Sequence, residues 1–241
     1  MTTSVPILGA GCLFAFLGSD FMNHTAYDVM REYMIEGADL NGPYQFPMMP
    51  RYTGRPGTDT VDFKDSFDRR IKNHKDLTIN FYIHDNEFEK IWNCPDKYIE
   101  HLKCFNSVIA PDFSMAVGEG GMPFAMNIWQ KYRNHAIAHY LYMNGIRVIP
   151  NVSIPPEYCY DWIFDGIPKR STVACCTNGR VKSKASRLEF CKGFQEMVRR
   201  LEPLRVIIVG RMPQELQTDV EIINFKSRNQ KIKDREGKYK L

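Results

Sequence analysis

The stretch Leu77-Thr78-Ile79-Asn80-Phe81-Tyr82-Ile83-His84-Asp85 decides the fold. It begins as a short run rich in β-branched and aromatic residues, which is typical of a buried strand, and it ends on polar side chains. Similar runs recur along the chain at Ser107–Ala110, Ile146–Pro150, Thr172–Cys176, Arg205–Val209 and Val220–Phe225. The first five runs begin roughly 26 to 39 residues apart, which is the spacing of βα units.

Helical patterns fill most of the intervals between these runs. One begins at Pro95, and a longer one begins at Pro123 and ends at Asn144-Gly145. Proline suits the first turn of a helix, and glycine suits the residue after the last turn. A third pattern covers Ser186–Leu201 and is stopped by Pro203. Alternating strands and helices predict an α/β protein with a mainly parallel sheet.

Two architectures fit this alternation: an incomplete, TIM-like barrel and an open, doubly wound sheet. In a barrel, functional side chains follow many successive strands. In an open sheet they gather near the point where the strand order reverses. Polar side chains follow several of the runs in this sequence, so we favour the barrel-like arrangement.

Length and composition indicate one α/β domain with additions at its ends. The chain has 241 residues, 44% of them hydrophobic, which excludes disordered, collagen-like and coiled-coil proteins. We expect an N-terminal extension over residues 1–60 that packs on the main domain, an α/β domain over 61–225 and a basic tail over 226–241. The tail has seven basic and two acidic residues, so residues 1–225 carry −1 of the formal net charge of +4.

Cysteine usage and the N-terminus bear on location. The seven cysteines show no CxxC spacing, which favours reduced thiols in a cytoplasmic protein. The apolar run Val5–Leu17 has no Lys or Arg before it, since the first basic residue is Arg31. A signal peptide needs such a positive region, and the run is too short to span a bilayer. We therefore expect a buried strand or helix there and no membrane contact.

Polar residues follow the predicted strands. We consider a further segment, Tyr160–Phe164, as another candidate strand of the same kind. Because the carboxyl ends of parallel strands meet at one edge, these residues predict a polar pocket there. The residues that follow the segments are His84, Asp85, Asp112, Asn151, Thr177, Asn178 and, after Tyr160–Phe164, Asp165 and Lys169.

Three acidic residues, Asp85, Asp112 and Asp165, limit the kinds of reaction that this pocket could support. Together they can hold a hard divalent cation through their oxygens. Two of them can instead act as acid and base across a glycosidic bond, with His84 transferring a proton near neutral pH. The alternative is structural: Asp85 caps the helix Asn86–Trp92, and the other two stabilise turns.

Two weaker patterns suggest ligands. The loop Thr177–Lys184 combines glycine and basic side chains before a helix, which suits a phosphate, although it is not a P-loop. His135 and His139 have the spacing of a zinc helix but lack its glutamate, and His101 with Cys104 is a thinner hint. An ordinary solvated loop and buried histidines are the competing interpretations.

A family resemblance is carried by five segments: Phe81–Asp85, Ile109–Ser114, Ile128–Asn134, Val148–Val152 and Phe164–Lys169. Over residues 45–210 the sequence resembles the family catalogued as domain of unknown function 4417, found in phages, prophages, plasmids and other bacterial mobile elements. The resemblance implies this context and no particular reaction. It marks Asp85, Asp112, Arg133, Asn151, Asp165 and Lys169 as motif residues, while Thr177-Asn178-Gly179 departs from the expected form. The context implied by the resemblance would place the protein in the cytoplasm of a bacterial host.

Two functional hypotheses follow. The first is a hydrolase-like enzyme that acts on a phosphate-containing or glycosidic substrate, such as a nucleotide or nucleic acid. In it the carboxylates perform acid–base or metal chemistry, Arg133 and Lys169 neutralise substrate charge, and Asn151 orients the substrate. The second is a non-catalytic accessory protein that binds nucleic acid or a host protein, with the basic tail contacting phosphates.

Overall fold

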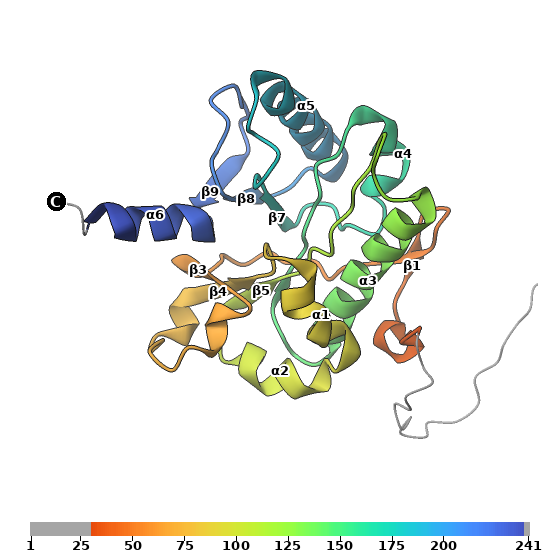
Figure 1. Cartoon of the computed structure of the whole chain (residues 1–241). Helices are drawn as coiled ribbons and strands as arrows, with labels where there is room; N and C mark the ends of the chain where they lie inside the picture. Colours follow the sequence, from red (N-terminus) through yellow and green to blue (C-terminus); the bar gives the residue numbers. More distant parts are fainter. Residues whose placement is uncertain (1–29, 239–241) are drawn as a thin grey trace, which may run out of the picture. The chain divides into compact units, whose positions relative to one another are not determined.

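The recurring apolar runs form parallel strands in a computed structural model that describes residues 30–238 (Figure 1). Six strands lie inside the predicted ranges, which confirms the strand positions read from the sequence. These strands are β4 (Leu77–Asn80), β5 (Ser107–Ile109), β6 (Val148–Ile149), β7 (Thr172–Cys176), β8 (Arg205–Val209) and β9 (Glu221–Phe225).

The strands add to one another in chain order. One sheet has the order β3-β4-β5-β6, where β3 is Asp59–Asp62, and the other has the order β7-β8-β9. All pairs in both sheets are parallel. The predicted α/β class with mainly parallel strands is therefore confirmed. A small antiparallel pair, β1 (Leu40–Asn41) and β2 (Phe46–Pro47), lies before them.

A single parallel bridge, between Asn151 and Ala174, connects the two sheets. Two backbone hydrogen bonds accompany it: Val152 N donates to Ala174 O at 2.7 Å, and Ala174 N donates to Pro150 O at 2.8 Å. Within residues 30–238, β3 and β9 each pair on one side only. The hydrogen-bonded strands therefore do not close into a barrel in this part of the chain.

Helices follow the strands, largely where the sequence predicts them. The pattern that begins at Pro123 forms α3, and Gly145 after it has a φ of 81°, as a helix-ending glycine does. The α-helices are α1 (Asp85–Asn93), α2 (Asp96–Lys103), α3 (Phe124–Met143), α4 (Tyr160–Ile163), α5 (Lys184–Leu201) and α6 (Arg228–Lys238). Short 3-10 helices cover η1 (Glu32–Ile35), η2 (Asp65–Phe67), η3 (His74–Asp76) and η4 (Glu157–Cys159).

The segment Tyr160–Phe164 is not a strand, so that prediction is wrong. Residues Tyr160–Ile163 form the short helix α4, and Trp162 and Ile163 are buried in the apolar core. A short apolar run of this kind has no periodicity that separates a strand from a buried helical turn. Asp165 consequently follows a helix and does not lie at the end of a strand.

Both faces of the parallel strands are buried, as their continuous apolar sequences require. Along β8, Val206 and Ile208 face one core cluster, which also includes Phe194 of α5. Ile207 and Val209 face a second cluster. This second cluster, called the inner cluster below, collects one side of five successive strands: Tyr52, Ile109, Ile149, Ala174, Ile207, Val209 and Phe225.

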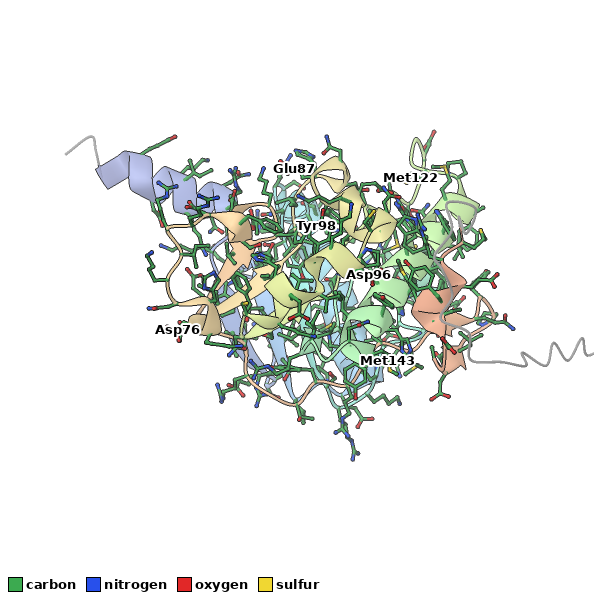
Figure 2. The ribbon with its side chains drawn as sticks, turned by 90° about the horizontal axis from the view of Figure 1, so that it is seen from below. Asp76, Glu87, Asp96, Tyr98, Met122 and Met143 are labelled. Carbon is green, nitrogen blue, oxygen red and sulfur yellow. The ribbon has the colours of Figure 1, made fainter. Side chains whose placement is uncertain are left out.

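Helix α3 is the longest helix and packs beside α1 and α2. Figure 2 shows it running between Met122 and Met143, with Asp96 of α2 beside it. The Tyr140 hydroxyl donates a hydrogen bond to Asp96 Oδ1. Arg133 pairs with Glu89 of α1 at 2.6 Å. These contacts place the first turn of α1 at the carboxyl ends of β4 and β5.

Residues 34–238 belong to one unit, and residues 30–33 belong to a separate unit that begins at Met1. The apolar run Val5–Leu17 lies outside the described residues, and the domain boundaries at 60/61 and 225/226 stay predictions. Part of the predicted tail is helical, since α6 covers Arg228–Lys238. Across the described chain, no helix is both long enough and apolar enough to cross a membrane.

Candidate functional site

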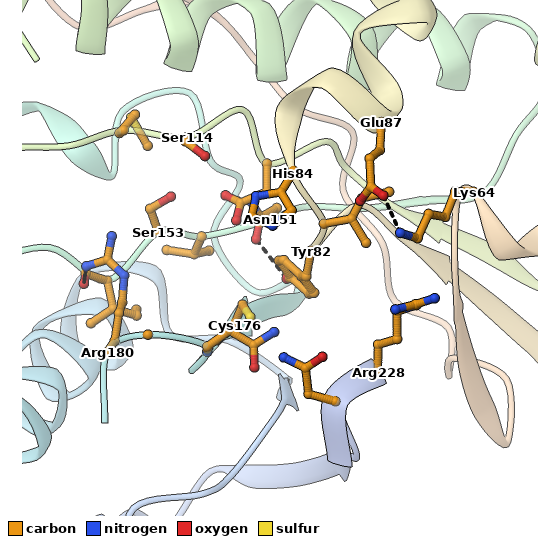
Figure 3. Close-up of a pocket in the computed structure, with 18 of the residues that line it drawn as sticks. Lys64, Tyr82, His84, Glu87, Ser114, Asn151, Ser153, Cys176, Arg180 and Arg228 are labelled. Atoms are coloured by element: carbon orange, nitrogen blue, oxygen red, sulfur yellow. Dashed lines mark hydrogen bonds and ion pairs between the residues drawn. The ribbon is translucent and has the colours of Figure 1, made fainter. Parts of the chain in front are cut away.

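A polar pocket lies at the carboxyl ends of β4, β5, β6 and β7 (Figure 3). Its volume is about 580 Å³, which is in the range of small-molecule sites. The floor includes Tyr82 after β4, Asp112 after β5, Asn151 after β6 and Cys176 at the end of β7. The position is the one that parallel α/β folds use for ligands.

A chain of hydrogen bonds runs across the floor. The Tyr82 hydroxyl donates to Asn151 Oδ1 at 2.9 Å, and Asn151 Nδ2 donates to Asp112 Oδ1 at 2.8 Å. Ser153 adds a further hydrogen bond to the Asp112 side chain. Because Asn151 is only 6% exposed, its amide holds the Asp112 carboxyl in a fixed orientation.

The surroundings of Asp112 favour its protonated form. Burial raises the pKa of Asp112, while the Asn151 hydrogen bond and the charge of Arg180 act in the opposite direction. Burial also raises the pKa of Tyr82 well above its usual value, with a smaller contribution from the Asp112 charge. A raised pKa makes a carboxyl group a better candidate for donating a proton than an ordinary aspartate.

Cationic side chains stand on two sides of the floor. Figure 3 shows Arg180 on the side opposite Lys64 and Arg228. Lys64 pairs with Glu87, and Arg228 pairs with Asp65 at 2.9 Å. These two cations are thus already neutralised by acidic neighbours.

The Arg180 side of the pocket is different. Arg180 Nη1 donates to the backbone oxygen of Ile154 at 2.8 Å, an uncharged acceptor. Lys182 lines the same pocket, and neither residue has a carboxylate within ion-pair distance among residues 30–238. An anion entering the pocket is therefore attracted to the loop that carries Arg180 and Lys182.

Four of the predicted site residues line this pocket: His84, Asp112, Asn151 and Asn178. Asp85 lies directly beside it. Asp85 is the first residue of α1, and His84 occupies the N-cap position, so the predicted cap at Asp85 is wrong. Its carboxylate instead accepts hydrogen bonds from Ser114 N at 3.1 Å and Ser114 Oγ at 2.8 Å, and Ser114 is a pocket residue.

The structure places Arg133, Lys169 and Thr177 outside the pocket lining. Arg133 is buried, pairs with Glu89 and lies 3.7 Å from the centre of the Phe113 ring. Lys169 is exposed and precedes β7, so it lies at the amino end of the strand. Thr177 is buried, and its backbone N donates to Val209 O at 3.1 Å.

Asp165 lies elsewhere, against Gly42 and near the buried amine of Lys131. Burial raises the pKa of Asp165, and the charge of Lys131 acts against that rise. The three carboxylates predicted to share a cation therefore do not meet. In the part of the chain that the structure describes, no group of three or more His, Cys, Asp or Glu is placed to hold a metal ion.

The histidines of the zinc-like pattern bind protein groups. His135 Nδ1 lies 2.8 Å from Pro47 O, and its Nε2 lies 2.8 Å from Lys131 Nζ. His139 Nε2 lies 3.1 Å from Glu36 O. The Nε2 of His101 lies 2.8 Å from Ser66 Oγ. Both ring nitrogens of His135 and the Nε2 atoms of His139 and His101 thus contact protein groups.

Cys176 is the cysteine at the pocket floor. Burial raises the pKa of Cys176 to about 12. Its sulfur is therefore a neutral thiol near pH 7, and a neutral thiol is a weak nucleophile.

Several pocket residues are not among the predicted site residues, and they differ in whether the sequence carries a signal for them. Tyr82 and Ser153 lie inside or next to the family-like segments, so attention to every polar residue there finds them. Lys64 and Arg228 come from a loop after β3 and from α6, and only the tertiary structure brings them together. Arg180 and Lys182 were part of the predicted phosphate loop, although they were not among the predicted site residues.

Comparisons with known proteins agree with the resemblance seen in the sequence. The chain is 31% identical over 134 residues to the Gene 1 protein of Mycobacterium phage L5, covering 56% of this chain and 57% of that protein. The Gene 1 protein of Mycobacterium phage D29 is also 31% identical over 134 residues, covering 56% of this chain and 48% of that protein. The matched region thus spans about half the length of these curated relatives.

No solved structure matches the chain. The family model described as Domain of unknown function (DUF4417) matches residues 38–226, which include every strand from β1 to β9. All the predicted site residues lie inside this range. The chain belongs to the Domain of unknown function (DUF4417) family.

Proposed function

We propose that the pocket binds a phosphate-containing substrate, a nucleotide or a nucleic acid, and that the protein is a hydrolase-like enzyme. One observation carries this proposal. The oriented Asp112 carboxyl, whose pKa is raised by burial, shares a pocket with Arg180 and Lys182, which have no carboxylate partner among the described residues. A proton donor and an anion-binding wall in one pocket suit hydrolysis of a phosphoester or of the glycosidic bond of a nucleotide.

Each group has a distinct proposed role. Arg180 and Lys182 bind the phosphate, and Asp112 donates a proton to the leaving atom as its bond breaks, which is the ester oxygen of a phosphoester or the base nitrogen of a nucleotide's glycosidic bond. Water adds its hydroxyl to the other half of the substrate and returns a proton to Asp112. Asn151 and Tyr82 keep the carboxyl oriented through their hydrogen bonds. Asp85 acts indirectly, because it holds the loop at Ser114.

We also propose that the two sheets are parts of one incomplete, TIM-like barrel. The consecutive strand order and the bridge between Asn151 and Ala174 support this arrangement. The inner cluster supports it further, since one side of five successive strands meets there. In such a fold the pocket occupies the carboxyl end, where barrel enzymes carry their active sites.

Three of the four tail cations whose side chains are described, all except Lys233, have acidic partners, which favours the enzyme over an accessory protein that binds nucleic acid through its tail. Lys226 pairs with Asp234, Arg228 with Asp65, and Lys231 with Asp59 at 2.6 Å. Cations engaged in this way are less available to a phosphate backbone. We therefore place substrate recognition in the pocket.

A thermal-shift screen with nucleotides, inorganic phosphate and short oligonucleotides, followed by a hydrolysis assay on the ligands that stabilise the protein, tests this proposal. We expect Arg180→Ala to weaken binding of the stabilising ligand about tenfold, since it removes a charge-assisted hydrogen bond. We expect Asp112→Asn to lower turnover at least about 100-fold while binding persists.

Two exposed residues supply matched controls. Arg147→Ala, just before the amino end of β6, and Asp161→Asn make the same chemical changes at exposed positions outside the pocket lining, and should leave binding and turnover unchanged. A wild-type protein that none of these phosphate ligands stabilises would contradict the proposal. So would an Asp112→Asn variant with wild-type turnover.

A further inference from the structure

Asp62 is a buried acid that the proposed mechanism does not use. It is the last residue of β3 and only 7% exposed, and it lies opposite Asn80 in the register with β4. Its position is therefore at the same carboxyl edge of the sheet as the pocket. Burial raises the pKa of Asp62, and a hydrogen bond from the Asn80 side chain acts in the opposite direction.

One oxygen of this carboxyl lacks a hydrogen-bond partner. Asp62 Oδ2 is fully enclosed and accepts no hydrogen bond among residues 30–238. The nearest cationic atom is Arg228 Nε at 3.7 Å, which is beyond hydrogen-bond distance. Buried carboxylate oxygens are normally satisfied, so an unpartnered one points to a donor that arrives from outside the chain.

The unpartnered oxygen lies directly behind the pocket wall. Arg228, which stands next to it, is a pocket residue, and so is Lys64, two positions after Asp62. Cys176 on the pocket floor lies close enough for the Asp62 charge to affect its pKa, although burial is the largest cause of that shift. Arg228 is therefore a pocket residue in contact range of Asp62, and a shift of its side chain would open space for a ligand group beside the unpartnered oxygen.

The attachment of Arg228 makes such a shift easy. Arg228 is the first residue of α6, and its stronger contact is with Asp65 at 2.9 Å. Helix α6 is held to β3 by polar contacts, with Lys231 Nζ at 2.6 Å from both Asp59 Oδ1 and Thr60 O. Charged contacts at a surface are weak and adjustable compared with apolar packing.

We propose that Asp62 is a substrate-binding residue whose free oxygen accepts a hydrogen bond from a hydroxyl group of a sugar phosphate. This inference rests on the proposed function, because Arg180 and Lys182 hold the phosphate of the same ligand. Arg228 moves aside toward Asp65 when the sugar enters. The site thereby selects phosphate esters that carry a hydroxyl donor over esters that lack one.

Calorimetric titration with two probes tests the proposal: ribose 5-phosphate, which has hydroxyl donors, and methyl phosphate, which has none. The wild-type protein should bind ribose 5-phosphate about tenfold more tightly, in line with one hydrogen bond to a charged acceptor. Asp62→Ala should reduce this preference to twofold or less and leave methyl phosphate affinity unchanged. Asp161→Ala, which removes an exposed acid outside the pocket lining, should keep the full preference.

A conservative variant guards against loss of folding. If Asp62→Ala does not give a cooperative melting transition, the test uses Asp62→Asn instead. We expect Asp62→Asn to reduce the preference for ribose 5-phosphate over methyl phosphate at least threefold. A preference that survives both substitutions overturns the role of Asp62. Equal wild-type binding of the two probes also overturns it.

Arg180→Ala separates this inference from the proposed function. It should weaken both probes to the same extent. If it does so while the wild-type protein shows no preference for the sugar, the phosphate site stands and the Asp62 inference fails. If neither probe binds the wild-type protein, or if Arg180→Ala has no effect on either, the proposed function fails, and this inference fails with it.

Discussion

Lys131 is a charged residue enclosed by the fold. It is 3% exposed, with its Nζ at 2.8 Å from His135 Nε2 and 2.9 Å from Ile163 O. It also lies over the Phe46 ring, 4.7 Å from the ring centre. Burial lowers the pKa of Lys131 to about 7, while the Asp165 charge acts against that change. The residue therefore connects α3, α4 and β2 while its charge opposes its burial.

The pH dependence of stability should reveal this opposition. The unfolded chain binds a proton at Lys131 up to its ordinary pKa of 10.5, and the folded chain loses that proton near pH 7. Between these values the unfolded state binds more protons, so the free energy of unfolding rises with pH. We expect the stability of the wild-type protein relative to Lys131→Met to increase from pH 7 to pH 10. For one proton the slope cannot exceed about 1.4 kcal/mol per pH unit.

Urea denaturation at several pH values measures this difference. The subtraction removes the titration of the cysteines and tyrosines, which both proteins share. Lys192→Met, at an exposed position on α5, should follow the wild-type curve at every pH. A flat difference between wild type and Lys131→Met across this range would contradict the prediction.

Residue identity together with strand position was enough to find part of the site. Asp112 and Asn151 follow strands that the apolar runs reveal, and both line the pocket. Arg133 shares a family-like segment but serves packing, because its guanidinium lies on the Phe113 ring and pairs with Glu89. Membership of a sequence motif does not reveal the direction in which a side chain points. That direction depends on helix packing between distant segments.

Arg133 and the packing of Trp92 against Trp129 together hold α1 to α3. Arg133 Nε also donates to Gln130 Oε1 at 3.0 Å, so its guanidinium has several partners. Its side chain is 10% exposed, whereas the Glu89 side chain is 40% exposed. We expect Arg133→Ala to lower the free energy of unfolding by about 2–4 kcal/mol, because it removes both the ring contact and the partner of a partly buried carboxylate. Urea denaturation measures this loss.

A surface ion pair provides the control for this prediction. Arg199 pairs with Glu196 at 2.7 Å, but its side chain is 68% exposed, so Arg199→Ala should cost less than about 1 kcal/mol. Since Arg133 lies outside the pocket, Arg133→Ala should leave the affinity for phosphate ligands unchanged at a temperature where it is folded. Loss of that affinity in a folded variant would mean that Arg133 contributes to binding after all.

Elements with a clear apolar pattern were predictable, and elements formed by context were not. The sequence Asp59-Thr60-Val61-Asp62 carries no strand signal, yet it forms β3 because β4 offers a free edge. Because β3 is not predicted from the sequence, Asp62 is not recognised as a residue at a strand end, since that position depends on the pairing of β3 with β4. The segment Tyr160–Phe164 shows the opposite failure, since an apolar run became the helix α4 once it packed against α5 and β2.

At the scale of the whole unit, the basic tail has a structural place that composition alone does not give. The net charge of +4 comes from a segment with +5 attached to a chain of −1. Part of that segment forms α6, and its described cations at positions 228 and 231 pair with acids of β3 and η2. The ion pairs between the basic tail and the acidic residues of the body thus hold α6 where its residue Arg228 lines the pocket.

The two sheets should unfold together. Their only strand-to-strand connection in residues 30–238 is the bridge at Asn151 and Ala174, but the inner cluster takes Ile149 from one sheet and Ile207 from the other. A core shared in this way makes each sheet depend on the other. We expect Ile149→Ala and Ile207→Ala each to lower the free energy of unfolding by about 2–5 kcal/mol in a single transition.

Hydrogen exchange followed by mass spectrometry can report the two sheets separately. In each variant the amides of β4–β6 and of β7–β9 should lose protection by the same free energy, because exchange from both requires the same global opening. Leu188→Ala, at a position 43% exposed on α5, should change neither sheet by more than about 0.5 kcal/mol. If Ile207→Ala instead loosened only β7–β9, the sheets would be independent units. The proposal of one incomplete barrel would then fail, because a barrel requires the strands on both sides of the bridge to share one interior.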